Sequence, residues 1–483
     1  MKPLWTSKEL INISKGKCSK SFIATGVSID TRSLKRGDLF IALKDKRDGH
    51  DFVEEAFSKG ASAAIISKKV KTKKEMPLLL VKDVNETFNN LALAARKRSK
   101  AKFVAVTGSA GKTSTKEMLK SVLSKDFSVH ATEKNFNNKL GVSLTLSNLH
   151  SNVDYAIVEI GMNERGEISP LSKLVSPHIA IITSIGQSHL ENLKSVENIM
   201  LEKLDVCDGL NKKGICFIPG DFKNLNKLLE KVQKKEINYK LFGISDKCDY
   251  KLFDAKIKFN STIGIVKKNN FESFFIKIHS LGIHNLINAL SVIAVFDFFK
   301  LDLTKAILNI SNWTPAVGRG NIKKIYFDDI IQDKFFFIID ESYNSNPLSV
   351  SAALKTLSSL ENINLNISEK IKIRKIAILG DMLELGVQKN KIHRDLIHIN
   401  NLNEIDCFYC VGKLMLNFFK LLPKKKQGKW FSDVNILNKD ILKFIQNGDI
   451  IMIKGSNSIG LNKVVDHLLS KNENSFKNYY SEN

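Results

Sequence analysis

The sequence predicts an α/β protein of three domains: a small N-terminal α/β domain, a central domain with a mostly parallel sheet and helices on both faces, and a C-terminal α/β domain. Three observations support this prediction. The chain has 483 residues, which is too long for one ordinary hydrophobic core. Apolar strands alternate with helical patterns between residues 100 and 314, and the alternation starts again afterwards. A glycine-bounded loop at residues 107–114 separates the first of these strands from a helix.

The N-terminal domain is expected to cover residues 1–99. Gly37 and Asp38 mark a turn, and the segments that follow predict a strand, a helix and a second strand, at residues 39–43, 52–59 and 63–66. A helical segment at 89–98 is expected to close the domain. Its basic last turn suits the negative end of the helix dipole. We therefore place the domain boundary near Ser99.

The central domain is expected to span residues 100–314, and the C-terminal domain residues 315–483. In the central domain, apolar runs predict strands at 103–106, 155–160, 179–185, 215–218 and 239–242. Residues 250–278 alternate polar and apolar side chains, which predicts a β-hairpin added to the sheet. Further strands are predicted at 335–339, 376–379, 407–411 and 450–453, so we expect a Rossmann-like C-terminal domain. The polar residues 472–483 are expected to be frayed.

The composition is that of a globular protein, with 43% hydrophobic residues. The N-terminus lacks the apolar segment of a signal peptide, and polar residues interrupt the most apolar long segment, residues 281–299. We therefore expect a cytoplasmic protein with no membrane span. Six cysteines in so long a chain do not make a disulfide framework. Cys407 and Cys410 form a C-x-x-C pair inside a predicted strand, where buried thiols are favoured over a zinc or redox site.

The net charge of +24 raises the alternative of a nucleic-acid-dependent ATPase. The lysines are scattered, however, and runs such as 68–74 and 424–426 lie between predicted elements without interleaved aromatic residues. Such runs are typical of solvated loops, and a positive surplus also suits small anionic ligands such as nucleotides. We therefore expect no nucleic-acid partner.

The loop after the predicted strand at 103–106 has the composition of a phosphate-binding loop. Gly108 and Gly111 let the backbone approach a polyphosphate, so that N–H groups and the helix N-terminus face the anion. Lys112 would reach the outer phosphates, and the Thr113 hydroxyl would help to hold Mg²⁺. Val106 stands where the general pattern has an earlier glycine, and an ordinary strand-to-helix turn capped by Thr113 is the alternative. The residues expected to bind a nucleotide are Gly108, Ser109, Ala110, Gly111, Lys112, Thr113 and Ser114.

Two further polar residues are expected at the same edge of the sheet. Glu159 ends an apolar strand, and Mg²⁺ binds through one or two carboxylates plus phosphate oxygens, so Glu159 and Thr113 suit that ion. A glutamate at a strand end is also an ordinary solubilising residue. His189 follows another apolar strand, but imidazole is a poor ligand for Mg²⁺ and a lone histidine is usually structural.

Nine motifs, in order and over nearly the whole chain, resemble those of the Mur ligases. They are Thr107-Gly-Ser-Ala-Gly-Lys-Thr, Asn135-Phe-Asn-Asn-Lys-Leu-Gly-Val142, Glu159-Ile-Gly, Ser188-His-Leu, Gly282-Ile-His-Asn-Leu-Ile-Asn-Ala289, Gly318-Arg319, Asp340-Glu-Ser-Tyr-Asn-Ser-Asn-Pro347, Gly380-Asp-Met-Leu-Glu-Leu-Gly386 and Lys454-Gly-Ser456. Within that family, the motifs at 342–347 and 380–386 resemble the branch that adds D-alanyl-D-alanine. The resemblance implies an ATP-dependent, Mg²⁺-dependent ligase whose small-molecule substrates are UDP-N-acetylmuramoyl-tripeptide and D-alanyl-D-alanine. We expect it to act as a monomer.

The resemblance also implies roles for single residues. It places His189 in the Mg²⁺ site and identifies Lys203 with the lysine that is carbamylated in these ligases, which turns a cation into an anion able to hold a second metal. Lys112, Lys203 and His189 are therefore the expected catalytic residues, and Thr113, Glu159, His189 and Lys203 the expected metal ligands. From the sequence alone, Lys203 is only a surface lysine of an amphipathic helix.

The remaining implied roles are binding roles. The resemblance implies that ATP is contacted by Asn288, Arg319, Asp340, Tyr343 and Asn344. It implies that the UDP precursor is contacted by Thr31, Arg32, Asn137 and Asn138. Thr31 stands where the family more often has serine, and Glu341 stands where aspartate is commoner, so Glu341 is left without a role. The nearest alternative of the same fold is a folylpolyglutamate synthetase, which the Ser-Tyr-Asn-Ser-Asn-Pro run at 342–347 argues against.

Overall fold

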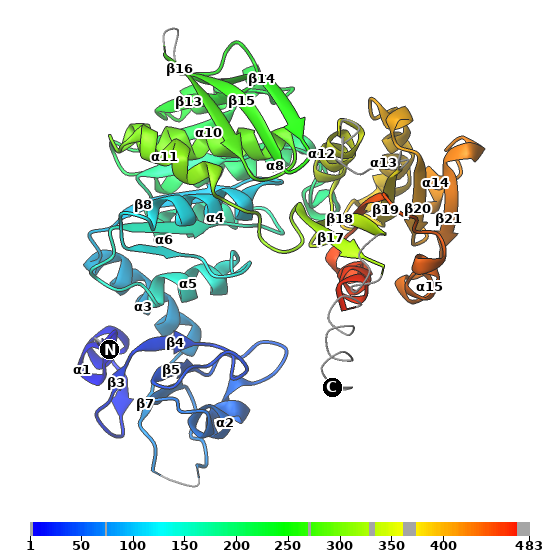
Figure 1. The fold of residues 1–483 in the computed structure, drawn as a ribbon. Coiled ribbons are helices and arrows are strands. Elements are labelled where there is room, and N and C mark those ends of the chain that lie inside the picture. Colours follow the sequence, from blue (N-terminus) through cyan, green and yellow to red (C-terminus); the bar gives the residue numbers. More distant parts are fainter. Residues whose placement is uncertain (1–2, 73–74, 269–271, 328–333, 361–372, 471–483) are drawn as a thin grey trace, which may run out of the picture.

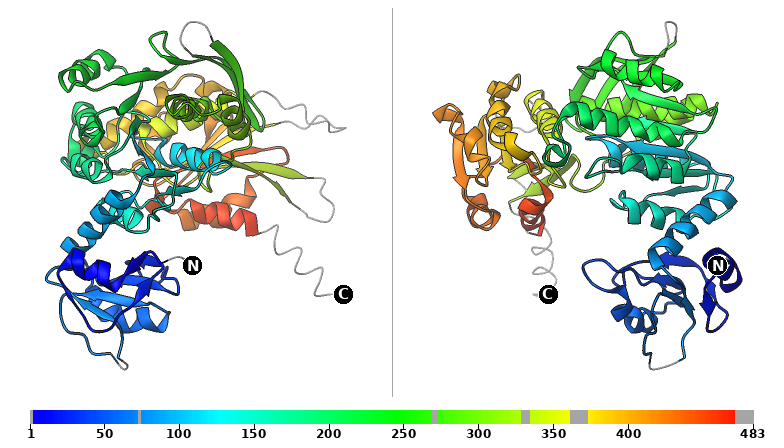
Figure 2. Two further views of the ribbon diagram at one scale, coloured as in Figure 1. Left: turned by 90° about the vertical axis from the view of Figure 1, so that its left-hand side faces the viewer. Right: turned by 180° about the vertical axis from the view of Figure 1, so that it is seen from behind.

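The computed structural model describes residues 3–72, 75–268, 272–327, 334–360 and 373–470, and they form three domains (Figure 1). The central domain lies between the other two. In Figure 1 and in the right-hand view of Figure 2, the N-terminal domain lies below it and the C-terminal domain beside it. The predicted three-domain α/β fold is confirmed. The predicted boundaries near residues 99 and 314 stay predictions.

The N-terminal domain is a small α/β unit. Its described strands form a five-stranded sheet in the order β2-β7-β6-β5-β4. The bounds are β2 Lys17–Cys18, β4 Gly26–Ser28, β5 Asp38–Ile41, β6 Ala63–Ile66 and β7 Leu78–Leu80, with a separate pair β1 Trp5–Thr6 and β3 Ile23–Ala24 and the helices α1 Ser7–Ser14 and α2 Val53–Ser58. The strands predicted at 39–43 and 63–66 and the helix predicted at 52–59 are present as β5, β6 and α2.

Helix α3, Val84–Arg98, joins the N-terminal domain to the central domain (Figure 1). Leu91 belongs to the apolar core of the N-terminal domain, whereas Ala92 belongs to a core of the central domain. At its end, the Arg98 guanidinium donates to the carbonyl oxygen of Leu4 at 2.9 Å and to that of Leu149 at 3.3 Å. One helix is thus shared by two cores.

The central domain contains the sheet that carries the phosphate loop. Its described strands form a nine-stranded sheet in the order β16-β15-β14-β13-β12-β11-β8-β10-β9, parallel from β9 to β14. The bounds are β8 Lys102–Thr107, β9 Val129–Ala131, β10 Tyr155–Glu159, β11 Ile179–Ile182, β12 Ile215–Pro219, β13 Tyr239–Gly243, β14 Tyr250–Lys258, β15 Ser261–Lys268 and β16 Glu272–Ile278. The predicted hairpin at 250–278 is present as the antiparallel strands β14, β15 and β16.

Helices cover both faces of this sheet. Neighbouring residues of a strand point to opposite faces, so each buried strand contributes apolar side chains to two cores. In β8, Phe103 packs into one apolar core with α5, α6 and α8, and Val104 packs into the other with α4 and α10. The bounds of the helices are α4 Lys112–Leu123, α5 Lys139–Ser147, α6 Ile168–Val175, α7 Leu190–Leu193, α8 Val196–Leu204, α9 Leu225–Lys234, α10 Ile283–Phe298 and α11 Leu303–Ser311. None of the described helices has the length and apolar composition that crossing a bilayer requires.

Strand β11 ends earlier than predicted. The sequence predicts a strand at 179–185, but β11 stops at Ile182. The hydroxyl of Thr183 donates to the Thr107 carbonyl oxygen at 3.2 Å. The hydroxyl of Ser184 donates to the Ala110 carbonyl oxygen at 2.9 Å. These polar side chains therefore leave the sheet to support the phosphate loop.

The C-terminal domain has a mostly parallel sheet. In the part of the domain that the structure describes, six strands occur in the order β17-β18-β22-β19-β20-β21, and only β17 is antiparallel to its neighbour. The bounds are β17 Asn321–Tyr326, β18 Phe335–Glu341, β19 Lys375–Gly380, β20 Cys407–Val411, β21 Gln427–Phe431 and β22 Ile450–Lys454, with the helices α12 Pro347–Ser358, α13 Lys389–Asp395, α14 Leu416–Phe419 and α15 Val434–Asp440. Cys407 and Cys410 lie in β20 as free thiols, and Cys410 is buried. The predicted frayed segment, 472–483, lies outside the described residues.

Candidate active site

The phosphate loop connects β8 to α4 and requires glycine at two positions. Gly111 has a φ of 85°, and a Cβ atom there would lie 2.7 Å from the side-chain oxygen of Asn288. Gly108 has a φ of 154°, and a Cβ there would collide with the hydroxyl of Thr183. Within the described ranges no side chain caps α4, so its first N–H groups remain available to an anion. The predicted strand, loop and helix are all present.

The first half of the loop is held from behind by the segment that follows β11. The Ser109 N–H donates to the Ser184 carbonyl oxygen at 2.9 Å, and the Ala110 N–H donates to the Ser184 hydroxyl at 2.8 Å. The Ser109 hydroxyl donates to the Gly186 carbonyl oxygen at 3.0 Å. Ser109 and Ala110 therefore use these groups to shape the loop, and the N–H groups of the following residues are left to meet a ligand.

Two charged groups contact the Thr113 hydroxyl, and a polar side chain supports one of them. The Thr113 hydroxyl donates to one carboxylate oxygen of Glu159 at 2.9 Å, and the guanidinium of Arg319 donates to the same hydroxyl oxygen at 3.1 Å. The side chain of Asn137 donates to the other carboxylate oxygen of Glu159 at 2.7 Å, and Glu159 is only 1% exposed. The structure thus brings together the loop, the acidic end of β10 and the arginine of the C-terminal domain.

Lys112 lies within this group of charges. Its ammonium donates to the Gly108 carbonyl oxygen at 2.8 Å, which closes the loop. Burial lowers the pKa of Lys112, the charge of Glu159 opposes that shift, and the charge of Arg319 adds to it. A partly desolvated cation between an acid and a second cation is suited to receive the negative charge of a phosphate.

Lys203 is a buried lysine on α8. Its side chain is 2% exposed, and none of the described residues forms a hydrogen bond or an ion pair with its ammonium. Burial and then the charge of Lys112 hold the pKa of Lys203 well below its usual value. The neighbouring Glu202 carboxylate is already used, because it accepts the N–H groups of Gly166 at 2.7 Å and Ile168 at 2.9 Å. The interpretation of Lys203 as a surface lysine is therefore wrong.

His189 faces the C-terminal domain. Its Nδ1 lies 2.7 Å from a carboxylate oxygen of Glu384, and the hydrogen bond from His189 lowers the pKa of Glu384. Among the described residues, no group of three or more His, Cys, Asp or Glu side chains could hold a metal. A metal at Thr113 and Glu159 would therefore depend on oxygen atoms of a bound phosphate as well.

The C-terminal domain presents Arg319 through its own internal contacts. The Arg319 guanidinium lies over the Tyr343 ring, 4.2 Å from its centre. The carboxylate of Asp340 accepts the Gly318 N–H at 3.0 Å and the Ser342 hydroxyl at 2.6 Å. Asp340 therefore holds the turn before Arg319, and Tyr343 supports its side chain.

Some residues at this interface had no assigned role in the sequence analysis. The side chain of Asn346 caps α12 and also donates to the Ser109 carbonyl oxygen of the loop at 3.0 Å. Lys454, which is buried, lies 3.2 Å from the carboxylate of Glu341 and donates to the Asn344 carbonyl oxygen at 3.0 Å. All of these residues lie in the quoted motifs, and that position was the only signal that marked them.

The residues expected to hold the UDP precursor lie in two places. In the N-terminal domain, Thr31 is buried. Hydrogen bonds from the Lys59 ammonium and, to a smaller extent, from the Thr31 hydroxyl lower the pKa of Glu55. The Arg32 side chain is 79% exposed and pairs with Asp30 at 2.6 Å. In the central domain, Asn137 contacts Glu159, and Asn138 caps α5 by accepting the Gly141 N–H at 2.9 Å. The structure therefore links Asn137 to the phosphate-loop site through Glu159, whereas Asn138 has the role of a helix cap.

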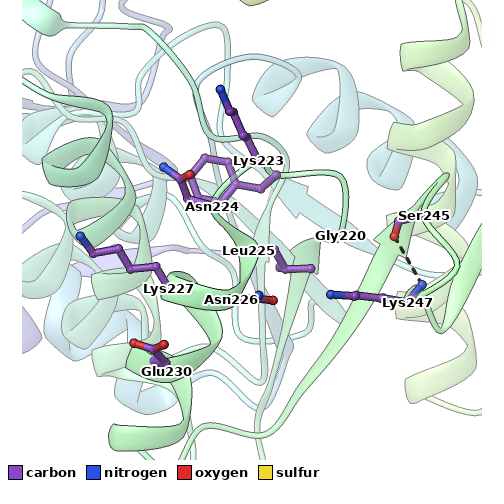
Figure 3. A pocket seen from close by; sticks show the side chains of 10 residues that line it. Gly220, Lys223, Asn224, Leu225, Asn226, Lys227, Glu230, Ser245 and Lys247 are labelled. Carbon is purple, nitrogen blue, oxygen red and sulfur yellow. Dashed lines mark hydrogen bonds between the residues drawn. The ribbon is translucent and has the colours of Figure 1, made fainter.

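A pocket of about 740 Å³ lies away from all of these residues (Figure 3). It is formed by the loops after β12 and β13 and by the start of α9, and its lining includes Lys223, Lys227 and Lys247. None of the predicted site residues lines it. The pocket is therefore not part of the site around Thr113.

Three family models match the chain. The model of the Mur ligase family catalytic domain matches residues 24–118, that of the Mur ligase middle domain residues 106–296, and that of the Mur ligase glutamate ligase domain residues 329–457. The UDP-N-acetylmuramoyl-tripeptide--D-alanyl-D-alanine ligase of Rickettsia prowazekii is 35% identical over 96% of this chain and 99% of its own. The ligase of that name from Bacillus subtilis is 32% identical over 96% of this chain and 98% of its own.

Solved structures are similar over the same length. MurF from Acinetobacter baumannii has a TM-score of 0.82 with 25% identity and covers 97% of this chain and 99% of its own. The MurF ligase of Thermotoga maritima in complex with ADP has a TM-score of 0.76 with 25% identity and covers 93% of this chain and 98% of its own. The folylpolyglutamate synthase of Mycobacterium tuberculosis is 15% identical with a TM-score of 0.56, over 77% of this chain and 94% of its own, and so shares the fold alone.

Proposed function

The chain belongs to the Mur ligase family, and we propose that its three domains assemble the family's reaction around Thr113 of the central domain. It is an ATP-dependent ligase that joins D-alanyl-D-alanine to UDP-N-acetylmuramoyl-tripeptide through an acyl phosphate, in the synthesis of peptidoglycan precursors. The contacts of Thr113 with Glu159 and Arg319, at 2.9 and 3.1 Å, support the proposed assembly most directly. They join the loop to the domain on its other side.

The nucleotide phosphates would lie at the N-terminus of α4. The free N–H groups there and the Lys112 ammonium supply positive charge where the transferred phosphoryl group spreads its negative charge. Arg319 adds a second cation from the C-terminal domain. These groups act by position and charge, because phosphoryl transfer leaves little covalent chemistry for the protein.

The donor set around Glu159 fits Mg²⁺. The ion prefers oxygen ligands and is usually held by one or two carboxylates together with substrate phosphates, and Glu159 and Thr113 provide one carboxylate and one hydroxyl. The resemblance to the family adds His189 as a further, nitrogen ligand. When bound, the ion would neutralise charge on the phosphates. Asn137 would keep the Glu159 carboxylate in place.

The environment of Lys203 favours carbamylation. A neutral amine can attack the carbon of CO₂: a nitrogen–carbon bond forms, one proton leaves to solvent, and a carbamate anion replaces the ammonium. Burial and the charge of Lys112 favour the neutral amine. An anion at this position would be attracted by Lys112, whereas the ammonium is repelled by it.

Activity is expected to depend on CO₂. In CO₂-free buffer the ligation rate should fall about tenfold or more, and bicarbonate should restore it, because removal of a group that orients a metal site costs about 10- to 100-fold. Lys203→Ala should be inactive in both buffers, and the exposed Lys212→Ala is the matched control. Ligation rates with and without bicarbonate test this. A wild-type rate that is insensitive to CO₂, or an active Lys203→Ala variant, would contradict the carbamate.

The second substrate supplies the nucleophile. An α-amino group has a pKa of about 7.7–8.0, so a fraction of the D-alanyl-D-alanine molecules already has an unprotonated amino group at pH 7. Its nitrogen attacks the acyl phosphate carbonyl: a carbon–nitrogen bond forms, the carbon–oxygen bond to the phosphate breaks, inorganic phosphate leaves, and the nitrogen loses one proton to solvent. Holding both reactants in one site accounts for much of such a rate enhancement. Their translational and rotational entropy is already lost when they bind, so this loss no longer adds to the barrier of the chemical step.

The proposed arrangement assigns one substrate to each outer domain. The N-terminal domain, residues 1–99, would hold the UDP end near Thr31 and Arg32, and the C-terminal domain, residues 315–483, would present the dipeptide. The central domain, residues 100–314, would hold ATP between them. We also propose that the enzyme acts as a monomer in the cytoplasm, where ATP and its UDP-linked substrate are available.

Phosphate release with the two substrates tests this function. ATP and UDP-N-acetylmuramoyl-tripeptide alone should give little phosphate, and addition of D-alanyl-D-alanine should start steady release with one pentapeptide product formed for each phosphate. Single-stranded DNA or RNA should not stimulate release. Stimulation by nucleic acid that is steeply salt-dependent, without any pentapeptide product, would instead support the nucleic-acid-dependent ATPase.

A further inference from the structure

A hydrogen bond between two domains is centred on His189. Nδ1 of His189 lies 2.7 Å from a carboxylate oxygen of Glu384, which belongs to the C-terminal domain. The contact is reinforced by the backbone, because the Glu191 N–H donates to the Glu384 carbonyl oxygen at 3.1 Å. Gly386 lies against the same segment, since a Cβ there would be 3.1 Å from the Cα of Glu191. The segments 189–191 and 384–386 therefore lie side by side.

The backbone at both residues is unusual. His189 has a φ of 51° and Glu384 a φ of 61°, and both values lie in the left-handed region that residues other than glycine rarely adopt. Such conformations cost free energy and persist where the surroundings hold them. Here they bring the imidazole of one domain to the carboxylate of the other.

The loop that carries Glu384 is fixed within its own domain. The Met382 N–H donates to Nε2 of His393 at 3.0 Å, and His393 is fully buried. The Leu383 N–H donates to the hydroxyl of Ser456 at 3.0 Å. Glu384 is therefore presented by a supported loop, although its own side chain is 60% exposed.

The chemistry of the contact determines which nitrogen of His189 is free. A carboxylate can only accept hydrogen bonds, so Nδ1 must carry the proton that is shared with Glu384. Neutral imidazole then has its lone pair on Nε2. Histidines that bind metals through one nitrogen commonly donate the other N–H to a carboxylate, which fixes the orientation of the ring.

We propose that Glu384 is a positioning residue that fixes the orientation of the His189 imidazole and leaves Nε2 free to bind a metal. This inference rests on the proposed function, in which His189 is a metal ligand. It adds that the orientation of this ligand comes from the C-terminal domain. The metal site is then complete only when the two domains lie as they do here.

Metal affinity provides a test that does not depend on turnover. Mn²⁺ binding in the presence of ADP can be followed by electron paramagnetic resonance of the free ion. Glu384→Ala should weaken Mn²⁺ binding about tenfold, the lower end of the range for losing such a carboxylate. Glu191→Ala is the matched control and should bind Mn²⁺ like the wild type, because its side chain forms no hydrogen bond or ion pair with the described residues.

A double-mutant cycle distinguishes positioning from a general loss of structure. In the His189→Ala background, Glu384→Ala should have no further effect on Mn²⁺ affinity, since there is no ring left to orient. An equal loss in that background, or no loss in Glu384→Ala alone, would overturn the inference while leaving the proposed function intact. If His189→Ala binds Mn²⁺ as tightly as the wild type, the inference fails together with the metal role proposed for His189. Thermal unfolding of each variant should stay close to that of the wild type, because the Glu384 side chain is mostly exposed.

Discussion

Lys112→Ala is expected to reduce ATP-dependent ligation about 10²- to 10³-fold, the usual cost of removing one preorganised donor from a site of charge development. The fold should survive. The Lys112 ammonium bonds to the Gly108 carbonyl oxygen, and its charge is repelled by Arg319 and Lys203. Removing it loses one hydrogen bond and the attraction of Glu159, but it also removes a buried cation and its repulsion of Arg319 and Lys203, so the net change in stability should be small. Pentapeptide formation measures the loss, and circular dichroism with thermal unfolding checks the fold.

Lys120→Ala is the matched control for Lys112→Ala. Lys120 lies on the same helix, α4, but its side chain is exposed. This variant should keep the wild-type rate. If Lys112→Ala retains ligation within a few-fold of Lys120→Ala, the phosphate loop cannot be the site of phosphoryl transfer, and the proposed mechanism is wrong.

Arg319→Ala is expected to lower kcat about 10³-fold, which is the lower end of the range for an arginine that stabilises phosphoryl transfer. Arg319 reaches Thr113 from the other domain and is held over the ring of Tyr343. Arg319→Lys should recover little of this loss, because an ammonium has neither the planar fork nor the stacking surface of a guanidinium. Rates at saturating ATP separate the effect on kcat from a weaker affinity.

The exposed Arg394 of the same domain offers a control for Arg319. Arg394→Ala should leave kcat unchanged. An Arg319→Ala variant with a normal kcat and only a raised KM for ATP would assign Arg319 to nucleotide binding alone. Normal values of both would remove the C-terminal domain from the phosphoryl-transfer step.

The sequence predicted the parts of the fold that local patterns determine. The strand at 103–106, the loop and the following helix are present as β8, the glycine-bounded turn and α4, because apolar runs, glycines and helical spacing act over a few residues. The short edge strand β21 was missed. Its residues Gly428 and Lys429 are exposed, so it lacks the apolar run that marks the buried strands.

The site was predictable where residues adjoin the loop and hidden where domains meet. Thr113 and Glu159 were paired from the sequence, since neighbouring parallel strands bring their ends to one edge. The contacts of Asn346 with Ser109 and of Glu384 with His189 join segments about 200 residues apart. No local pattern specifies such pairs. The same holds for the burial of Lys203, which the spacing of a helix surface could not reveal.

Helix α3 has a consequence for which precursors the enzyme accepts. Helix α3 belongs to the cores of both the N-terminal and central domains, and we therefore expect it to hold the first domain at a set distance from the phosphate loop. With the UDP end held in the first domain as proposed, this distance sets the length that a precursor must have for its terminal carboxylate to reach the phosphate loop. A precursor one amino acid shorter would leave its terminal carboxylate about 3.5 Å short of the phosphate, the length of one extended residue. Chain length, and not only side-chain identity, would then select the tripeptide.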